Sequence, residues 1–371
     1  MPAINVMIKP ASGLCNMRCK YCFYADETAR RAVPSYGIMS YETLEAVLKR
    51  VLNFATGSCN IMFQGGEPTM AGLDFFKTVM QLEEKWNVNH VAIYNAIQTN
   101  GYNLNREWAA FYAEHHFLVG LSLDGPKDVH DLYRVDADGE GTFRQVTHAM
   151  QLLRQYQVEF NVLTVVTKYA ARNIRKIYGF FQRNQLAWQQ YIPCLDPLDE
   201  VRGQHIYSLL PEDFESYLKN LFDCWYNEAM RGYVRYNRYF INLINMMRGQ
   251  APEACGMSGV CGRQFVVEAD GSVYPCDFYM LDEWRLGSFI TDSFEQIEAK
   301  RNELGFVELS KQVDDACKTC KWAALCRGGC RRDREPMQNG LLQKNYFCNA
   351  YYNFFKYAYP RLLQLSQTLH N

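Results

Sequence analysis

The sequence lacks an excess of charge of either sign, a long apolar run and a leader-like N-terminus. Its 39 Lys and Arg against 40 Asp and Glu give a net charge of −1, so nothing in the charge favours a polyanionic partner such as nucleic acid. No stretch approaches the roughly 20 apolar residues of a membrane span. The first residues lack the basic, apolar and small-residue order of a signal peptide. We therefore expect a cytoplasmic protein with no nucleic-acid or membrane partner.

Cysteine, in contrast, is abundant. The chain has 14 cysteines among 371 residues, of which 48% are hydrophobic. Disulfides are disfavoured in a reducing compartment, and a chain of this length buries enough core to fold without them. Metal or redox chemistry is the better expectation, and the spacing of the cysteines has to decide it.

The first half of the chain alternates short apolar runs with segments of helical periodicity. Leu44, Val47, Leu48 and Val51 follow helical spacing, and Thr142 is a plausible N-cap for a helix that starts at Phe143. Such alternation predicts an α/β fold with a parallel sheet and crossover helices. Six strands are too few for a closed eight-stranded barrel, so we expect a partial (β/α)6 barrel with functional residues after the strands' C-terminal ends. The predicted strands are Asn5–Pro10, Asn60–Gln64, Val91–Gln98, Phe117–Asp124, Glu159–Val166 and Ala187–Pro193.

The second half has a different pattern, which suggests three parts to the chain. We expect the barrel in residues 1–200, a helical connection in 201–250 that includes a helix at Pro211–Met230, and a separate domain in 251–371. Eight cysteines and little long periodicity lie between Cys255 and Cys348, so this domain is expected to fold around metal. An aromatic and leucine-rich helix, Asn345–Leu369, is expected to close it.

Three cysteines follow the first predicted strand as C-x3-C-x2-C, with Tyr21 before the last of them: Cys15, Cys19 and Cys22. Three thiolates hold three irons of a 4Fe–4S cube, whose complete ligation needs four cysteines. The fourth iron is then open to a chelating ligand. The alternatives are a zinc site or an ordinary cluster that shares these cysteines.

A glycine loop, Gln64-Gly65-Gly66-Glu67-Pro68, ends the second predicted strand. The two glycines allow the backbone to approach a ligand closely, and either the Glu67 side chain or a free peptide group would then hold an ammonium group. Alone, this pattern more often marks a turn. No G-x-G-x-x-G follows a strand anywhere in the chain, so a dinucleotide fingerprint is excluded.

Eight cysteines in the last third are enough to ligate two 4Fe–4S clusters completely. Two structural zinc sites are the serious alternative, because tetrahedral thiolate sites and C-x2-C spacing also suit zinc. Spacing alone does not say which cysteines share a cluster. The three remaining cysteines, Cys59, Cys194 and Cys224, lie singly in apolar contexts and are expected to be buried core thiols.

Taken together, these motifs resemble those of the radical S-adenosylmethionine (SAM) enzymes with a SPASM extension. Over nearly its whole length the chain resembles the anaerobic sulfatase-maturating enzymes. The matching stretches include Ile8-Lys9-Pro10, Cys22-Phe23-Tyr24, Phe63–Pro68, Gln98–Gly101, Gly120–Ser122, Asp124–Pro126, Gln264–Glu268 and Asp270–Tyr279.

The resemblance implies SAM and three 4Fe–4S clusters as cofactors. Cys15, Cys19 and Cys22 would hold the cluster that binds SAM. One auxiliary cluster would be held by Cys255, Cys261, Cys276 and Cys330, and the other by Cys317, Cys320, Cys326 and Cys348. The SAM contacts that it implies are Tyr21, Gly65, Gly66, Glu67, Ser122, Arg134 and Leu195. Read singly, Ser122 fits a strand-end cap, Arg134 a solvated charge and Leu195 a core residue equally well.

The resemblance also implies a reaction, oxidation of one Cys or Ser of a sulfatase polypeptide to Cα-formylglycine. A 5′-deoxyadenosyl radical removes a hydrogen from the target β-carbon, a base removes the thiol or hydroxyl proton, and an auxiliary cluster accepts the electron. Asp277, directly after Cys276, matches the family's base. Partial burial beside a negatively charged cluster should raise its pKa, which suits a base. Without the resemblance a turn-forming Asp is the simpler interpretation; with it, the catalytic role is favoured.

Two other functions stay open at this stage. A related SPASM maturase would crosslink a ribosomal peptide with the same clusters, and a non-catalytic electron carrier or zinc scaffold would cleave no SAM. The implied partners are a sulfatase polypeptide as substrate and a low-potential electron donor such as a ferredoxin or flavodoxin.

Overall fold

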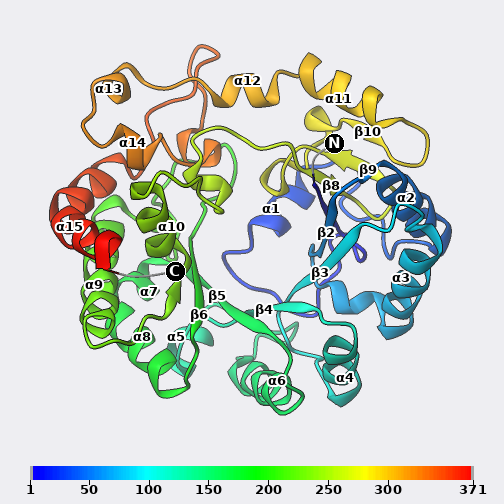
Figure 1. Cartoon of the computed structure of the whole chain (residues 1–371), viewed down its shortest axis with the longest axis horizontal. Coiled ribbons are helices and arrows are strands. Elements are labelled where there is room, and N and C mark those ends of the chain that lie inside the picture. Colours follow the sequence, from blue (N-terminus) through cyan, green and yellow to red (C-terminus); the bar gives the residue numbers. More distant parts are fainter. Residues whose placement is uncertain (1–2, 369–371) are drawn as a thin grey trace. The chain divides into compact units, whose positions relative to one another are not determined.

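The computed structural model describes residues 3–368, which form two compact units. The first unit contains residues 3–123, 131–160 and 263–304, and the second contains residues 124–130, 161–262 and 305–368. Figure 1 labels the elements of both. The boundaries at residues 200 and 250 that the sequence suggests stay a prediction.

Four parallel strands form the centre of the sheet in the first unit: β1 (Ile4–Ile8), β2 (Ser58–Phe63), β3 (Ala92–Thr99) and β4 (Leu118–Ser122). Burial alternates along β1, where Ile4, Val6 and Ile8 are buried and Asn5 is exposed, as expected for one covered face. On its other side β1 pairs with β8 (Phe265–Val267), which continues antiparallel into β9 (Ser272–Tyr274) and β10 (Gly287–Ser288). These three short strands carry the segment around Cys276 onto the edge of the sheet.

The first unit's helices are α1 (Phe23–Ala29), α2 (Tyr41–Phe54), α3 (Leu73–Trp86), α4 (Arg106–Glu114), α6 (Phe143–Gln155) and α11 (Phe294–Glu303). Short 3-10 turns are η1 (Pro68–Ala71), η3 (Asp277–Tyr279) and η4 (Asp282–Trp284). The α2 helix buries the apolar stripe that its spacing predicts. Thr142 precedes α6 as predicted, but its hydroxyl makes no cap and instead donates to the Arg134 carbonyl at 3.0 Å.

The second unit contains β5 (Phe160–Val166), β6 (Trp188–Pro193) and β7 (Tyr236–Asn237), joined in parallel between β5 and β6 and between β6 and β7. Its longer helices are α8 (Ile174–Arg183), α9 (Pro211–Ala229), α10 (Arg238–Met247) and α15 (Cys348–Thr368). Aromatic rings of α9, α10 and α15 pack together, with Phe222 5.3 Å from Phe240 and 5.8 Å from Phe354 between ring centroids. Such pairs add to the stabilisation from burial alone.

The cysteine-rich parts of the second unit have only short elements. These are η2 (Cys255–Met257), α12 (Phe306–Ser310), α13 (Asp315–Lys318), α14 (Ala323–Cys326) and η5 (Arg331–Arg334). The remaining helices of this unit are α5 (Lys127–His130) and α7 (Lys168–Arg172). Low periodicity between Cys255 and Cys348 therefore reflects turns and single helical turns that bring cysteines together.

The predicted α/β class is confirmed, and each of the six predicted strands is present with ends within two residues of those predicted. The helix predicted at Pro211–Met230 is α9. The closing helix is α15; the end predicted for it at Leu369 lies outside the described residues. Cys59 and Cys194 are buried as expected, but the expectation for Cys224 is wrong, because it is only half-buried and its thiol lies 4.0 Å from Arg175 Nη1.

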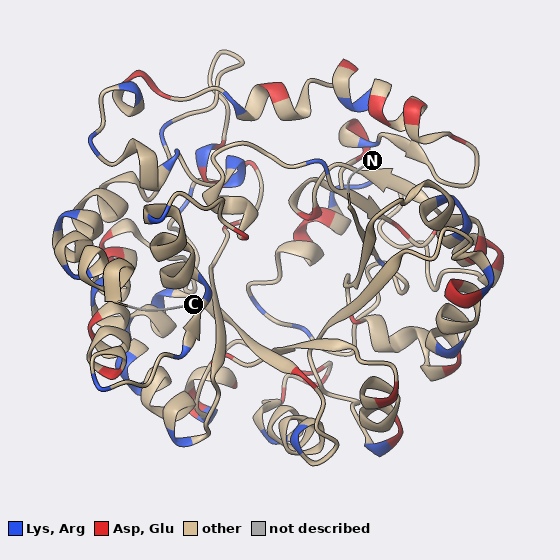
Figure 2. Cartoon of the chain, in the orientation of Figure 1, with Lys and Arg blue, Asp and Glu red and all other residues tan. Residues whose placement is uncertain are grey.

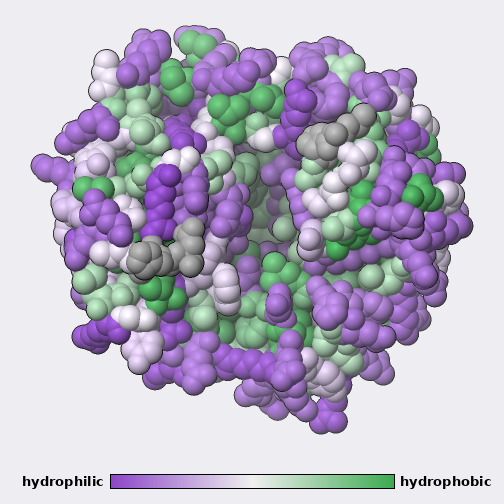
Figure 3. All heavy atoms as spheres, viewed as in Figure 1, coloured by the Kyte–Doolittle hydropathy of each residue, from purple (hydrophilic) through white to green (hydrophobic). Residues whose placement is uncertain are grey.

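The distribution of charged residues agrees with the near-zero net charge of the sequence. Along the helices, Lys and Arg alternate with Asp and Glu, and no helix in the described part of the chain carries a long run of one sign (Figure 2). On the face drawn in Figure 3 hydrophilic residues predominate and apolar ones occur in small groups. Among residues 3–368, none of the helices combines the length and the apolar character that crossing a membrane requires.

Candidate active site

The three-cysteine loop and the glycine loop interlock at the C-terminal ends of β1 and β2. The backbone N–H of Gly66 donates to the Ser12 carbonyl at 2.9 Å, and that of Glu67 donates to the Leu14 carbonyl at 2.8 Å. A Cβ atom at Gly66 would lie 2.1 Å from the Leu14 carbonyl oxygen, closer than real contacts allow. Glycine is therefore required at position 66 because the loop before Cys15 passes directly over it.

The Glu67 carboxylate is buried and fully engaged by the protein itself. It accepts hydrogen bonds from Thr69 N at 3.1 Å, Thr99 Oγ1 at 2.8 Å and Asn100 N at 2.7 Å. Burial raises the pKa of Glu67, and these donors oppose that rise. The side chain thus braces the ends of β2 and β3. Of the two ammonium-binding options, this arrangement favours the loop backbone over the Glu67 carboxylate.

The loop places hydrogen-bond donors around the first cysteine. Cys15 Sγ accepts from the backbone N–H of Met17 at 3.4 Å and from Asn100 Nδ2 at 3.7 Å. Burial raises the pKa of Cys15 to about 11, partly opposed by the Met17 N–H, and the charge of Cys22 contributes to the rise, so these two thiols are neighbours. Metal ligation deprotonates such thiols outright. Asn100 was not predicted from the sequence as a site residue, although it lies in the matching stretch Gln98–Gly101.

Arg134 is buried with 6% of its surface exposed, so its interpretation as a solvated charge is excluded. Its Nη1 lies 4.0 Å from Cys19 Sγ, and its guanidinium carbon lies 5.5 Å from the centroid of the Tyr21 ring. Burial raises the pKa of Cys22, and the charge of Arg134 opposes this. A buried guanidinium close to the Cys19 and Cys22 thiols suits either thiolates or the carboxylate of a ligand.

Ser122 and Leu195 are predicted SAM contacts that lie at, or just beyond, the ends of two different strands. Ser122 is the last residue of β4, is buried, and its Oγ accepts from Gln98 Nε2 at 3.3 Å. Leu195 follows β6 in the second unit, is half-buried, and its carbonyl accepts from the Cys194 thiol at 3.7 Å. Gly65 (φ 131°) and Gly66 complete the first unit's share of the predicted SAM contacts.

Asp277 begins η3 directly after Cys276 and is buried. Its carboxylate forms an ion pair with Lys9, a fully buried lysine at the end of β1, and accepts from Gln64 Nε2 at 3.1 Å. The turn-forming interpretation does not fit these partners, because both come from other strands. The role of Asp277 as a base stays a prediction.

An aromatic ring and a second buried ion pair surround Lys9. Its Nζ lies 4.3 Å from the centroid of the Tyr24 ring, and the Tyr24 hydroxyl donates to Glu268 Oε2 at 3.0 Å. Arg31 Nη1 donates to the same oxygen at 2.5 Å, with both side chains fully buried. Lys9, Gln64 and Tyr24 were not predicted as site residues. Their signal was their presence in the stretches that carry the family resemblance.

In the second unit, seven cysteines fall into two groups. A Cβ atom built on Gly256 would lie 3.6 Å from Cys330 Cβ, so the segment at Cys255 touches Cys330. Burial raises the pKa of Cys330, and the charges of Cys255 and Cys261 add to this. We call these three thiols the inner group.

Charge interactions likewise link the other four thiols, which we call the outer group: Cys317, Cys320, Cys326 and Cys348. The two groups contain the residues that the resemblance assigns to separate clusters, with Cys276 in the first unit. Among the described residues, no three His, Cys, Asp or Glu side chains converge as ligands of one metal ion. The assignment of clusters to these groups stays a prediction.

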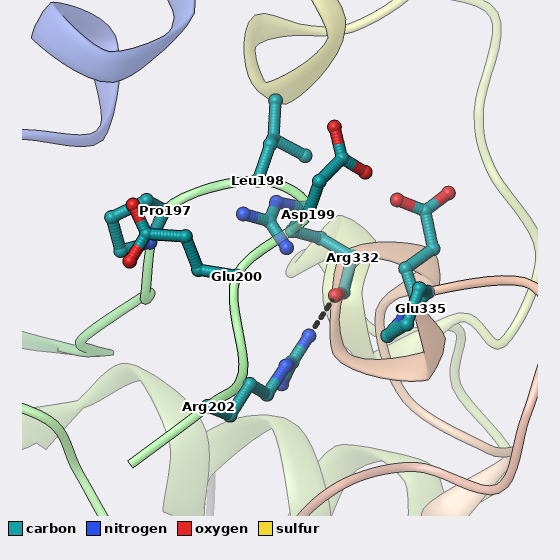
Figure 4. Close-up of a pocket in the computed structure, with 8 residues that line it drawn as sticks. Pro197, Leu198, Asp199, Glu200, Arg202, Arg332 and Glu335 are labelled. Atoms are coloured by element: carbon teal, nitrogen blue, oxygen red, sulfur yellow. Dashed lines mark hydrogen bonds between the residues drawn. The ribbon is translucent and has the colours of Figure 1, made fainter. Parts of the chain in front are cut away.

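A small pocket adjoins the loop after β6 in the second unit (Figure 4). In the close-up, Arg202 reaches from the loop and donates to the Arg332 carbonyl. The lining combines both charge signs with prolines: Pro197, Leu198, Asp199, Glu200, Arg202, Arg332, Glu335 and Pro336.

Comparison with known proteins identifies two domains in the chain. Residues 10–181 match the radical SAM superfamily, and residues 255–321 match the SPASM iron–sulfur cluster-binding domain. The chain is 47% identical to the cysteine-type anaerobic sulfatase-maturating enzyme of Clostridium perfringens, and the match covers all of both chains. It is 30% identical to the serine-type enzyme of Bacteroides thetaiotaomicron, covering 99% of this chain and 92% of that one.

Solved structures of related proteins match the fold of this chain. Native anSMEcpe with bound AdoMet and Cp18Cys peptide aligns over 100% of both chains with a TM-score of 0.95 and 47% identity. SuiB of Streptococcus suis, at 15% identity, covers 93% of this chain and 76% of its own with a TM-score of 0.64, which shows a shared fold. With a full-length relative at 47% identity, the chain belongs to the anaerobic sulfatase-maturating enzymes, a family of radical SAM enzymes with a SPASM domain.

Proposed function

We propose that this protein oxidises a cysteine of a sulfatase polypeptide to Cα-formylglycine under anaerobic conditions. The observation that carries the proposal is full-length identity of 47% to a cysteine-type enzyme, against 30% to a serine-type one. This difference favours cysteine over serine as the preferred target. The enzyme works in the cytoplasm and draws electrons from a low-potential donor such as a ferredoxin or flavodoxin.

In this proposal eleven thiols hold three 4Fe–4S clusters. One is held by Cys15, Cys19 and Cys22, where Asn100, the Met17 N–H and Arg134 supply donors and positive charge to the thiolates. When bound, SAM and the clusters supply a radical that removes hydrogen from the substrate, and acceptors for the remaining electron. The auxiliary ligand sets are the inner group with Cys276 and the outer group.

Around SAM, this chain supplies binding and orientation. Arg134 pairs with the SAM carboxylate, a charge-assisted bond of the stronger kind. The Gly65–Gly66 backbone faces the ammonium group, while Glu67 holds that backbone in place from behind. Tyr21, Ser122 and Leu195 complete the contacts.

Asp277 is the base that takes the proton from the substrate thiol. Lys9 forms an ion pair with its carboxylate, and Gln64 donates a hydrogen bond to one of its oxygens. An ionised, oriented carboxylate is what proton abstraction requires. Removal of one hydrogen atom, one electron and one proton from the substrate leaves a thioaldehyde, which hydrolyses to the aldehyde with loss of sulfide.

The decisive experiment uses the Asp277→Asn variant with SAM, a reductant and paired Cys- and Ser-type sulfatase peptides under anaerobic conditions. Hydrogen abstraction does not need the base, so deoxyadenosine should still form. Aldehyde formation should fall by about 10²–10⁴-fold, the usual scale for loss of a general base. The control is Asp282→Asn, at an exposed aspartate in the next 3-10 turn.

Near-normal formylglycine formation by Asp277→Asn would place the base elsewhere. Loss of both products would assign Asp277 to folding or peptide binding instead. A peptide mass that shows an intramolecular crosslink without release of sulfide would indicate the crosslinking function, which the full-length identities do not favour.

A further inference from the structure

Three buried arginines follow Cys330 in η5. One pairs with a carboxylate, and the other two donate hydrogen bonds to backbone carbonyls. Arg331, Arg332 and Arg334 expose 1%, 5% and 2% of their surfaces. Arg331 Nε pairs with Glu335 Oε1 at 3.2 Å, and Arg332 Nη2 donates to the Asp196 carbonyl at 2.8 Å. Buried charges normally have an opposite charge beside them, and the charge of buried Asp333 acts on both Arg332 and Arg334.

Arg334 is bound by backbone carbonyls alone. Its Nη1 donates to the Gln312 carbonyl at 2.7 Å, and its Nη2 donates to the Ser310 carbonyl at 2.9 Å and to the Gly259 carbonyl at 3.5 Å. Within residues 3–368 its Nε has no hydrogen-bond partner, and no carboxylate oxygen lies within ion-pair distance of it. Carbonyl dipoles solvate the guanidinium without neutralising it. Burial raises the pKa of Asp333, and the charge of Arg334 is among those that oppose this rise, so this buried carboxyl group also lies in the field of Arg334.

This charge lies beside the inner group. Ser310, whose carbonyl holds Arg334, also accepts through Oγ from the backbone N–H of Cys261 at 2.9 Å. Gly259, the other carbonyl partner, is two residues before Cys261, and its own Cβ position is closed by Arg327 backbone at 2.3 Å. Burial raises the pKa of the Cys261 thiol, and the charges of Arg331 and Arg334 oppose this rise, which agrees with the partner that Cys261 and Arg334 share in Ser310.

We infer that Arg334 raises the reduction potential of the auxiliary cluster at the inner group and so makes it the better electron acceptor. A cluster gains one negative charge on reduction, and a nearby buried cation stabilises that added charge. The inference rests on the proposed function, because it presupposes that a cluster is bound there. It goes beyond ligation, since the partners of Arg334 within residues 3–368 are backbone carbonyls and its charge acts on the cluster through space.

The test measures potentials rather than turnover. The full chain with Cys15, Cys19 and Cys22 replaced by alanine is reconstituted, so that only auxiliary clusters contribute, and is titrated under EPR. Arg334→Gln should lower the reduction potential of the inner cluster by about 59 mV. For a one-electron couple this shift is a tenfold change in the ratio of oxidised to reduced cluster at a given potential. Arg334→Lys keeps the charge and should restore most of the wild-type value. The outer cluster serves as the internal reference.

A second variant tests the opposite sign. Glu335→Gln removes the carboxylate that neutralises Arg331, so the inner potential should rise. The control is Arg327→Gln, an exposed arginine in the same run, whose charge water already screens. If Arg334→Gln does not assemble, Arg334→Met takes its place, and an unshifted inner potential in the variant that assembles overturns the inference. Absence of any auxiliary iron would instead refute the proposed function.

Discussion

The ammonium of Lys9 and the carboxylate of Asp277, 268 residues apart in the sequence, form an ion pair inside the first unit. The lysine side chain is fully buried and the aspartate side chain is 13% exposed, so water screens the pair only weakly. The pair joins the end of β1 to the turn that carries Cys276. It therefore ties the proposed base to the strand from which the first cysteine loop departs.

Replacing Lys9 with methionine should leave Asp277 buried without its cation. Loss of one partner of a buried pair costs about 3–5 kcal/mol, so the free energy of unfolding should fall by that order. Urea denaturation of the anaerobic protein measures it. The double variant Lys9→Met, Asp277→Asn should recover part of the loss, because no unpaired charge remains.

Lys77→Met is the matched control, since Lys77 pairs with Asp74 on the exposed face of α3. Surface pairs contribute little, so no measurable change is expected. Equal decreases in the free energy of unfolding in Lys9→Met and Lys77→Met would mean that the buried ion pair stabilises the fold no more than the exposed one does.

Substituting Gly66 with alanine should displace the first cysteine loop, because the new Cβ would lie 2.1 Å from the Leu14 carbonyl. Overpacking of this kind costs about 1–3 kcal/mol and forces the backbone apart. The expected result is loss of SAM binding and of the iron at Cys15, Cys19 and Cys22, measured by equilibrium dialysis and iron analysis. Gly57→Ala is the control, because nothing lies within 4 Å of its Cβ position; retention of SAM binding in both variants would contradict the close approach.

The sequence predicts the strands and the cysteine motifs because each is a local pattern. Alternating or continuous apolar runs identify β1 to β6, and C-x3-C-x2-C is legible within eight residues. The strands β8 to β10 were missed because two or three residues are too few to establish a period. Neither Lys9 nor Arg334 was predicted for its role, because each depends on partners that only tertiary structure brings close.

Iron content tests the grouping of the thiols. Eleven ligand cysteines and one open iron predict about twelve irons per chain as three 4Fe–4S clusters. Cys330→Ala and Cys348→Ala should each remove about four irons, and the double variant about eight. Cys59→Ala, at a buried thiol in β2, should retain all of them. Stoichiometric zinc in the anaerobically reconstituted protein would refute the cluster assignment.

The stability of the first unit should depend on pH through Glu83. This α3 residue is 4% exposed; its Oε2 accepts from Asn95 Nδ2 at 2.9 Å, while its Oε1 has no hydrogen-bond partner among the described residues. Burial raises the pKa of Glu83 from 4.5 to about 7, partly opposed by the Asn95 amide. The folded state thus holds its proton more tightly than the unfolded chain does.

A raised folded-state pKa contributes stability that is complete below the unfolded pKa and is lost as the pH rises through the folded one. Between about pH 5 and pH 8 the wild type should therefore lose on the order of 3 kcal/mol relative to Glu83→Gln, which stays neutral throughout. Urea denaturation at both pH values measures the difference. Glu84→Gln, at the exposed neighbour on α3, should follow the wild type. Parallel pH profiles for wild type and Glu83→Gln would show that Glu83 is ionised in the fold and that its charge is compensated.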